Sequence, residues 1–293
     1  MSNHWKELRI IVLIIFSAFV FVNLVISVFY IISGGVSSSG MEKLLEDRDR
    51  VLMLSLNSLS IMIFISPYFY VKKLSNYSIK IFPIHSTPII LVLLSTFLFM
   101  ILNSGVIEWN KSINFPEFMN SFETWAFNKE KELEKITMFL VSFENNWEFL
   151  FGILSIALIP GICEEYLFRG VLQKNFYLIS KNIHIAVWLS AFFFSALHLQ
   201  FYGFFPRMLL GVLFGYIYYW SGSILYPMIA HIFNNFFSLT IFYFSQKGLL
   251  NENFEVSVNS SPKIPMALII TSAVLFIGFM YLLRRYFLDN EKR

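Results

Sequence analysis

Hydrophobic and polar positions alternate along the chain in long blocks. Apolar runs that reach or approach about 20 residues, the length that crosses a bilayer core of about 30 Å, are separated by short polar breaks. These runs predict membrane-spanning helices near residues 10–33, 51–71, 87–107, 147–168, 183–199, 204–221, 224–244 and 265–286. The pattern therefore predicts an all-α, polytopic membrane protein with about eight transmembrane helices.

The longest polar connection, residues 108–146, contains an amphipathic segment. Within "NKEKELEKITMFLVSF", apolar residues recur at helical spacing beneath a charged face. They are Leu133, Ile136, Leu140 and Phe143. We expect this segment to form a helix along the membrane interface.

Polar residues begin to fall inside the apolar runs only after residue 146. This change divides the chain into three parts. We expect N-terminal helices with an interfacial loop over 1–146, a helical core over 147–244, and a polar loop with a C-terminal helix over 245–293.

An even number of spans places both termini on one side of the membrane. We expect that side to be the cytoplasm of a bacterial cell, because Lys and Arg residues are frequent at the termini and in the loops assigned to it. The first apolar run is longer than the h-region of a typical signal peptide, so we expect a retained first span. The small residues of "SGGVSSSG", 33–40, leave cleavage open.

Composition supports a membrane protein and narrows its partners. Of the 293 residues, 57% are apolar and 14% charged, against about 25% charged in ordinary soluble domains. The net charge of +3 forms no basic stripe, so the expected partners are the lipid bilayer and a membrane-associated substrate rather than nucleic acid. Cys163 is the only cysteine, which excludes an internal disulfide. Nothing in the sequence sets the oligomeric state.

Ionisable and amide side chains inside the later apolar runs are the main functional signal. A charged side chain near the membrane centre costs at least about 2.5–3.5 kcal/mol, so such groups usually face a protein interior or a wet cavity. The candidates are Glu164, Glu165 and Arg169 at the end of the fourth run, His198 at the end of the fifth, Arg207 in the sixth, and His231 and Asn235 in the seventh. We expect them to line one buried polar cavity.

Helical spacing assigns different roles to the two neighbouring glutamates. Glu165 and Arg169 are four residues apart and can pair on one face. Glu164 is turned by about 100° and stays free, which makes it the better candidate base. The alternative is an ion pair flanking a stop-transfer segment, but such a flank predicts no polar partners on other spans.

His231 and Asn235 are also four residues apart, and together they suit hydrogen-bond donation to an oxyanion. Asn234 points elsewhere. His198 can orient a water molecule or share a proton with it. The plainer alternatives are that Asn235 joins helices and that Arg207 reaches to the interface.

The three ordered motifs Glu164-Glu165-x-x-x-Arg169, Phe194-x-x-x-His198 and His231-x-x-x-Asn235 resemble those of the CAAX protease and bacteriocin-processing family, also called CPBP or Abi. This family includes the type 2 CAAX prenyl endopeptidases. The resemblance covers roughly residues 147–240, and it implies an intramembrane endopeptidase whose polar site opens near the cytoplasmic half of the membrane. Strict alternation of the spans, in contrast, places His198 at the outer end of the fifth.

The resemblance also implies residue roles. Glu164 with His198 activates a water molecule, while His231 and Asn235 donate to the oxyanion, each donor worth about 3–4 kcal/mol in other enzymes. Glu165 and Arg169 complete the expected catalytic set. This mechanism uses no cofactor. The metal-dependent alternative has zinc bound by Glu164, His198 and His231.

The function expected from these residues is hydrolysis of a peptide bond in a membrane-associated or lipid-anchored protein or peptide. One alternative is a non-catalytic membrane protein, such as a bacteriocin immunity protein or a scaffold. Another is a proton-coupled transporter, although the spans show no repeated pattern of broken helices. A thiol protease built on Cys163 is disfavoured, because the adjacent carboxylates oppose thiolate formation.

Overall fold

The computed structural model describes residues 2–32, 50–75, 79, 85–250 and 264–290. Regular structure in these ranges is helical, without a strand, as the all-α prediction requires. The stretch 33–40, where cleavage was left open, lies outside the described residues, as does most of the connection 245–264.

The helices follow one another along the whole chain. In order they are α1 (Ser2–Ile32), α3 (Arg50–Met62), the 3₁₀ turn η1 (Ile63–Ile65), α4 (Ser66–Ser75), α5 (Ser86–Lys111), the 3₁₀ turn η2 (Glu117–Met119), α6 (Asn120–Val141), α7 (Asn146–Gly152), the π-helix η3 (Ile153–Leu158), α8 (Ile159–Glu165), the π-helix η4 (Tyr166–Gln173), α9 (Lys174–Ser180), α10 (Ile183–Ala196), α11 (Phe204–Ser221), α12 (Leu225–Gln246) and α13 (Met266–Asn290).

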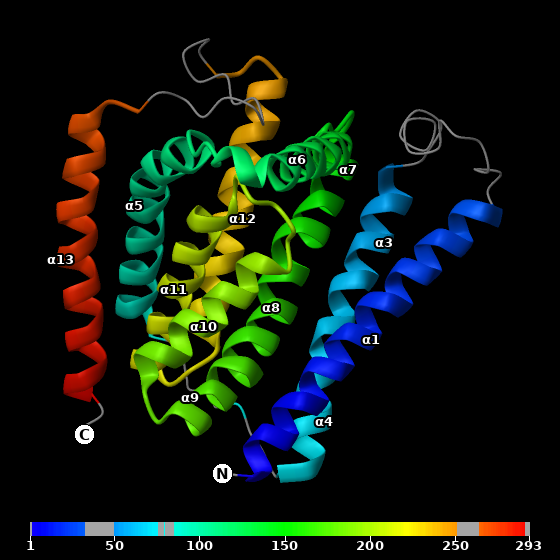
Figure 1. Ribbon diagram of the computed structural model, residues 1–293. Coiled ribbons are helices and arrows are strands. Elements are labelled where there is room, and N and C mark those ends of the chain that lie inside the picture. Colours follow the sequence, from blue (N-terminus) through cyan, green and yellow to red (C-terminus); the bar gives the residue numbers. More distant parts are fainter. Residues whose placement is uncertain (1, 33–49, 76–78, 80–84, 251–263, 291–293) are drawn as a thin grey trace.

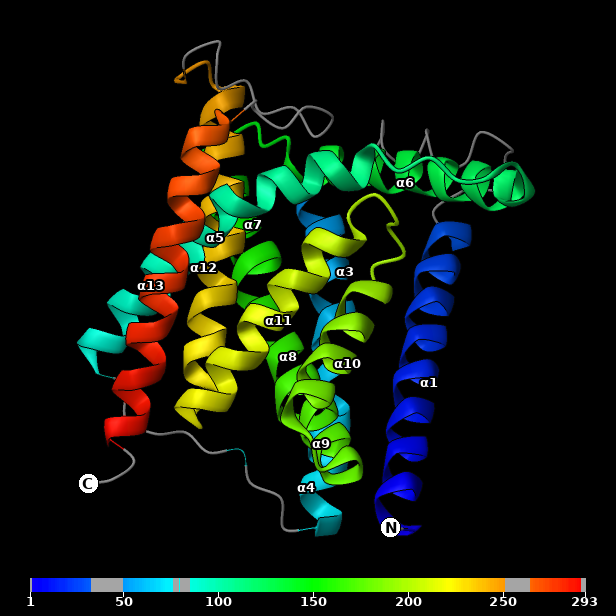
Figure 2. The ribbon, with the colours of Figure 1, turned by 60° about the vertical axis from the view of Figure 1, so that its left-hand side comes forward.

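Most helices run up or down one bundle (Figures 1 and 2). Helices α8, α10, α11 and α12 lie at its centre, with α1 and α3 to one side and α5 and α13 to the other. The amphipathic helix expected in the long connection is α6, which lies across the upper end of the bundle (Figure 2). Both chain ends lie at the lower end (Figure 1).

Among the residues that the structure describes, four helical stretches are long and apolar enough to cross a membrane. They are Arg50–Lys73, Ser86–Lys111, Asn146–Ser180 and Met266–Asp289. These stretches indicate a membrane protein, but the predicted count of about eight spans is not confirmed. Helix α10, with 14 residues, is about 21 Å long and falls short of the roughly 30 Å bilayer core.

The predicted boundary of the fourth span at residue 168 is wrong. Segments α7, η3, α8, η4 and α9 form one continuous helix of 35 residues, Asn146–Ser180. Glu164 and Glu165 therefore lie near the middle of this helix, and not at its end. The fifth helix ends earlier than predicted, at Ala196, so His198 lies in the turn that follows a short helix. Strict alternation of full spans thus does not apply to His198.

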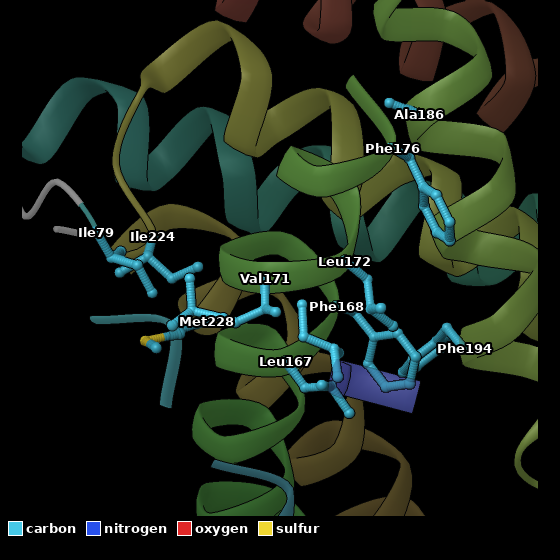
Figure 3. Close-up of a cluster of buried hydrophobic side chains, with 12 residues drawn as sticks. Ile79, Leu167, Phe168, Val171, Leu172, Phe176, Ala186, Phe194, Ile224 and Met228 are labelled. Carbon is cyan, nitrogen blue, oxygen red and sulfur yellow. The ribbon is translucent and has the colours of Figure 1, made fainter. Parts of the chain in front are cut away.

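The hydrophobic core surrounds η4 (Figure 3). At most 4% of the surface is exposed to solvent for each of four residues of this segment, Leu167, Phe168, Val171 and Leu172. Side chains from α1, α4, α9, α10 and α12 complete the cluster, among them Ile11, Val71, Phe176, Phe194 and Met228. Because protein encloses η4, its polar side chains must find their partners inside the protein.

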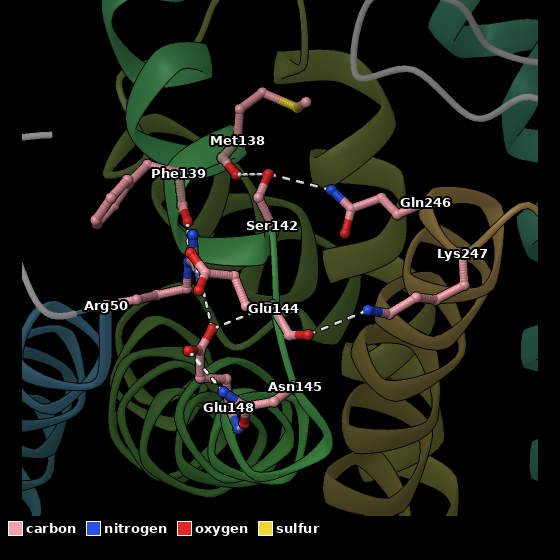
Figure 4. Close-up of polar contacts among 9 residues, drawn as sticks. All are labelled: Arg50, Met138, Phe139, Ser142, Glu144, Asn145, Glu148, Gln246 and Lys247. Carbon is pink, nitrogen blue, oxygen red and sulfur yellow. Dashed lines mark hydrogen bonds and ion pairs between the residues drawn. The ribbon is translucent and has the colours of Figure 1, made fainter. Parts of the chain in front are cut away.

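The upper end of the long helix is tied to its neighbours by polar contacts (Figure 4). Arg50, at the start of α3, pairs with the carboxylate of Glu148 and donates from Nε to the carbonyl oxygen of Phe139 at 2.8 Å. Lys247, directly after α12, donates from Nζ to the carbonyl oxygen of Glu144 at 3.2 Å. The connection between α6 and α7 is thereby held between α3 and α12.

Candidate active site

Glu165 lies at the centre of a fully enclosed polar cluster. Its Oε1 atom accepts hydrogen bonds from Arg169 Nη1 and from His231 Nδ1, each at 2.8 Å. The exposed fractions are 0% for Glu165, 1% for Arg169 and 3% for His231. The pairing of Glu165 with Arg169 agrees with the prediction from their spacing. The bond to His231 was not predicted.

Glu164 points to the other side of the same histidine. Its Oε2 atom lies 3.9 Å from His231 Nε2, beyond the length of a direct hydrogen bond. Glu164 is buried, with 8% exposure. His231 therefore stands between the two carboxylates, bonded to Glu165 through one ring nitrogen and facing Glu164 with the other.

The hydrogen bond to Glu165 indicates the tautomer of His231. An ionised carboxylate only accepts hydrogen bonds, so the proton of a neutral His231 ring lies on Nδ1. The Nε2 atom that faces Glu164 is then an acceptor. This differs from the expectation that His231 donates to an oxyanion, a role that needs a proton on Nε2.

Two polar side chains of η4 bind backbone carbonyls of α11. Arg169 Nη2 donates to the oxygen of Gly211 at 2.9 Å, and Gln173 Nε2 donates to the oxygen of Gly215 at 3.1 Å. Arg169 and Gln173 are four residues apart, and so are Gly211 and Gly215. The two contacts between η4 and α11 therefore repeat after about one turn of each helix. The two glycines permit close helix packing, since a Cβ atom at Gly215 would lie 2.9 Å from Gln173 Oε1.

Aromatic rings enclose the guanidinium group of Arg169. Its Cζ atom lies 5.0 Å from the ring centre of Phe194 and 5.3 Å from that of Phe214. The Phe214 ring also stacks on His231, with centroids 5.0 Å apart. The guanidinium group of Arg169 and the imidazole ring of His231 thus both pack against the Phe214 ring, which fixes the orientation of both.

Helices α8 and α12 lie in close contact at Gly161. A Cβ atom at this position would lie 2.5 Å from Ile232 Cγ1 and 3.1 Å from the Ile232 backbone nitrogen. Glu165 follows Gly161 by one turn, and His231 precedes Ile232. The close approach at Gly161 therefore brings Glu165 within hydrogen-bonding distance of His231.

His198 is held by its own turn. Its Nδ1 atom is 2.8 Å from the carbonyl oxygen of Phe194, which can only accept, so the Nδ1 atom carries a proton. The Phe194 ring lies between the two histidines, 5.3 Å from His198 and 5.8 Å from His231 by centroids. Among the residues that the structure describes, no hydrogen bond joins His198 directly to Glu164.

Asn235 is engaged by the backbone of η3. Its Nδ2 atom donates to the carbonyl oxygen of Ile156 at 3.1 Å, within a π-helical segment of a kind often found near functional sites. Its Oδ1 atom accepts from Asn234 Nδ2 at 3.0 Å. Asn234, which we expected to point elsewhere, is therefore part of this cluster.

Glu164, His198 and His231 are the ligands expected if the site binds zinc. In the structure these three side chains do not form a metal-binding group. Among the described residues, no group of three or more His, Cys, Asp or Glu side chains could hold a metal ion. His231 uses Nδ1 for Glu165, and His198 uses Nδ1 for a carbonyl oxygen, hydrogen bonds that a metal-bound histidine can also make with its other ring nitrogen.

Sequence reasoning missed two residues of the site, Gln173 and Gly161. Gln173 was not singled out, although it repeats the spacing of Arg169 and matches the two glycines of α11. Gly161 carries no signal in a single sequence. Arg207, a candidate for the polar cavity with an interfacial position as the alternative, donates from Nη2 to Gln200 Oε1 at 2.7 Å, and its Nη1 atom is buried without a hydrogen-bond partner among the described residues.

Residues 146–237 match the family model described as "Type II CAAX prenyl endopeptidase Rce1-like". This range contains all six predicted site residues and ends before the C-terminal helix. The description of that family is of an endopeptidase, which is a kind of hydrolase.

The chain is also similar to an uncharacterized protein, YpbD, of Bacillus subtilis (strain 168). The two are 34% identical over 83 residues, which cover 27% of this chain and 39% of the relative. No solved structure matches the chain significantly. Over residues 146–237, the family match therefore confirms the resemblance to the CAAX proteases that the three motifs predicted.

Proposed function

We propose that this protein is an intramembrane endopeptidase that hydrolyses a peptide bond in a membrane-associated or lipid-anchored protein or peptide. The observation that carries the proposal is the position of His231 between the two buried carboxylates. A purely structural ion pair needs Glu165 and Arg169 alone. It gives no reason to bury Glu164 on the other side of the histidine.

Glu164 is the general base of the proposed reaction. A water molecule that donates one hydrogen to Glu164 Oε2 and the other to His231 Nε2 can bridge the 3.9 Å between these atoms. Its lone pairs then point away from both groups, toward a substrate carbonyl carbon. Glu164 takes up the proton as the water attacks.

Glu165 and Arg169 act on the reaction through His231. The bond from His231 Nδ1 to Glu165 keeps Nε2 directed at Glu164. Arg169 compensates the charge of Glu165 inside the protein. His198 and His231 both contact the Phe194 ring. In the proposed reaction, His198 provides a second ring nitrogen that binds the water or the substrate.

Protease activity is tested with purified full-length protein in detergent micelles. Membrane and secreted peptides from cells that lack the protein serve as substrates, in water enriched in ¹⁸O. New peptide ends appear with the wild type, and each new carboxyl group carries one ¹⁸O atom, because water is the nucleophile.

The Glu164→Gln variant should produce none of these peptide ends. Asp289→Asn is the matched control, since Asp289 pairs with Arg285 on the exposed surface of α13, away from the site. If Glu164→Gln cleaves as well as the wild type, the proposed mechanism is wrong. A cellular phenotype that persists without any cleavage favours the immunity or scaffold alternative.

A further inference from the structure

Arg207 lies on the face of α11 that packs against the long helix. Arg169 and Gln173 bind the carbonyl oxygens of Gly211 and Gly215. The two helices therefore run in the same direction at this contact, in steps of one turn. One turn earlier on both helices, this register places Arg207 level with Glu165.

The packing of the neighbouring helix α10 against α11 also places Arg207 close to the site. A Cβ atom at Gly211 would lie 3.1 Å from the Cα atom of Ala191, so α10 and α11 pack closely there. The two helices are antiparallel (Figure 2). Since Gly211 packs against Ala191, the position one turn before Gly211 lies near the end of α10 at Ala196. Arg207 accordingly interacts electrostatically with His198 and, on α8, with Glu164.

The guanidinium group of Arg207 is only partly satisfied. Its Nη2 atom donates to Gln200 Oε1 at 2.7 Å, and Gln200 Nε2 in turn donates to Glu130 Oε1 of α6 at 3.4 Å. The Nη1 atom is buried and has no partner among the described residues. A charged donor that is buried without a partner is costly, which makes it a strong donor to a ligand that can accept.

The donors first expected for an oxyanion are already occupied. His231 uses the proton on Nδ1 for Glu165, and Asn235 Nδ2 donates to the Ile156 carbonyl oxygen. Arg207 Nη1 is, by contrast, a cationic N–H donor without a partner, on a side chain that acts electrostatically on Glu164.

We infer that Arg207 is a catalytic residue of this site, whose Nη1 atom donates a hydrogen bond to the carbonyl oxygen of the scissile peptide bond. The inference rests on the proposed function and adds to it the group that stabilises the oxyanion. It replaces Asn235 in that role and makes Asn235 a residue that positions α12 against η3.

The proposed step conserves atoms and charge. The water oxygen forms a bond to the carbonyl carbon, one water proton moves to Glu164, and the carbonyl electron pair moves to the oxygen held by Arg207. When the tetrahedral intermediate collapses, that electron pair re-forms the carbonyl group. The carbon–nitrogen bond breaks, and the proton on Glu164 passes to the leaving nitrogen.

The test uses purified full-length protein and an internally quenched, mixed-sequence peptide library in detergent micelles. Arg207→Gln should lower the apparent kcat by about 100-fold or more, with little change in KM, as expected for the loss of one oxyanion donor. Arg207→Ala should regain part of its activity when guanidinium chloride is added. A residue that only supports the fold gives no such rescue.

Two matched variants separate this role from anchoring of α6. Gln200→Ala removes the residue that links Arg207 to α6, and Glu130→Ala removes the α6 end of this link, while both variants keep the guanidinium group itself. Both should retain most of the wild-type kcat. An equal loss in these variants shows that Arg207 only anchors α6, and overturns the inference.

The remaining outcomes separate this inference from the proposed function. If Arg207→Gln stays within about twofold of the wild-type kcat while Glu164→Gln is inactive, the inference is wrong and the endopeptidase stands. If only KM rises, and only for peptides with a free C-terminal carboxylate, Arg207 binds that carboxylate and the inference is again overturned. If Glu164→Gln is fully active, both fall together.

Discussion

His231 of α12 donates a hydrogen bond from Nδ1 to Glu165 Oε1 of α8 at 2.8 Å, across 66 residues of sequence. The same oxygen accepts from Arg169. Glu165 is thus bonded to a cation and to an imidazole, whereas Glu164 faces His231 at 3.9 Å without a direct hydrogen bond. Two adjacent glutamates therefore have different consequences when they are replaced.

Glu165→Gln should destabilise the protein, and Glu164→Gln should not. Removing the Glu165 charge leaves the buried Arg169 uncompensated, which typically costs about 3–5 kcal/mol. Thermal unfolding of the two purified variants in the same detergent measures the difference. Equal unfolding temperatures for the two variants contradict the division between a structural and a chemical carboxylate.

Gly161→Ala should separate α8 from α12. The new methyl group would lie 3.1 Å from the Ile232 backbone nitrogen, which cannot move out of its helix. We expect a loss of about 1–3 kcal/mol in stability and a weakened bond between Glu165 and His231. Gly278→Ala is the matched control, because no atom lies within 4 Å of that Cβ position. A Gly161→Ala variant as stable and active as this control rules out the close approach as a determinant of the site.

Arg169→Lys should destabilise the site although the charge is kept. Arg169 reaches Glu165 with Nη1 and the Gly211 carbonyl oxygen with Nη2, and one ammonium group cannot reproduce this planar geometry. The loss of one charge-assisted hydrogen bond predicts a cost of about 1.5–3 kcal/mol, measured by unfolding in detergent. Arg285→Lys, on an exposed helical pair, should change stability little. An Arg169→Lys variant that unfolds like the wild type shows that the bond to Gly211 contributes nothing.

The local relationships of the site could be predicted from the sequence. Glu165 and Arg169 pair because a four-residue spacing places them on one helical face, and the structure confirms that pair. The positions of the helical segments also follow from the apolar runs. Both inferences depend only on residues close together in the chain.

The non-local relationships could not be predicted in the same way. Arg169 looked like the polar end of a span because one of its partners, the Gly211 carbonyl oxygen of α11, carries no side-chain signal in the sequence. For the same reason the predicted boundary at residue 168 was wrong. The bond from His231 to Glu165 depends on the approach of α8 to α12, which one glycine permits.

Removal of divalent metals should leave peptidase activity unchanged. The proposed base and its partners are a carboxylate and an imidazole, and among the described residues no group of three or more His, Cys, Asp or Glu side chains could hold a metal ion. Activity is measured after dialysis against a strong chelator, with the metal content of the same sample determined in parallel. Loss of activity that returns on addition of zinc supports the metal-dependent alternative.

The docking of α6 should weaken as the pH rises, through Glu130. Burial raises the pKa of Glu130 above its ordinary value of 4.5, against the lowering effects of the Tyr202 backbone and of the Arg207 and Lys111 charges. The folded state then holds this proton more tightly than the unfolded state, so stability is fully present below about 4.5 and declines as the pH rises toward the raised pKa. Hydrogen exchange of α6, corrected for the intrinsic rate at each pH, should show this decline in the wild type and lose it in Glu130→Gln. Glu132→Gln, on the same helix and paired with Lys129, should keep the wild-type profile, and an unchanged profile in Glu130→Gln would assign the pH dependence to another group.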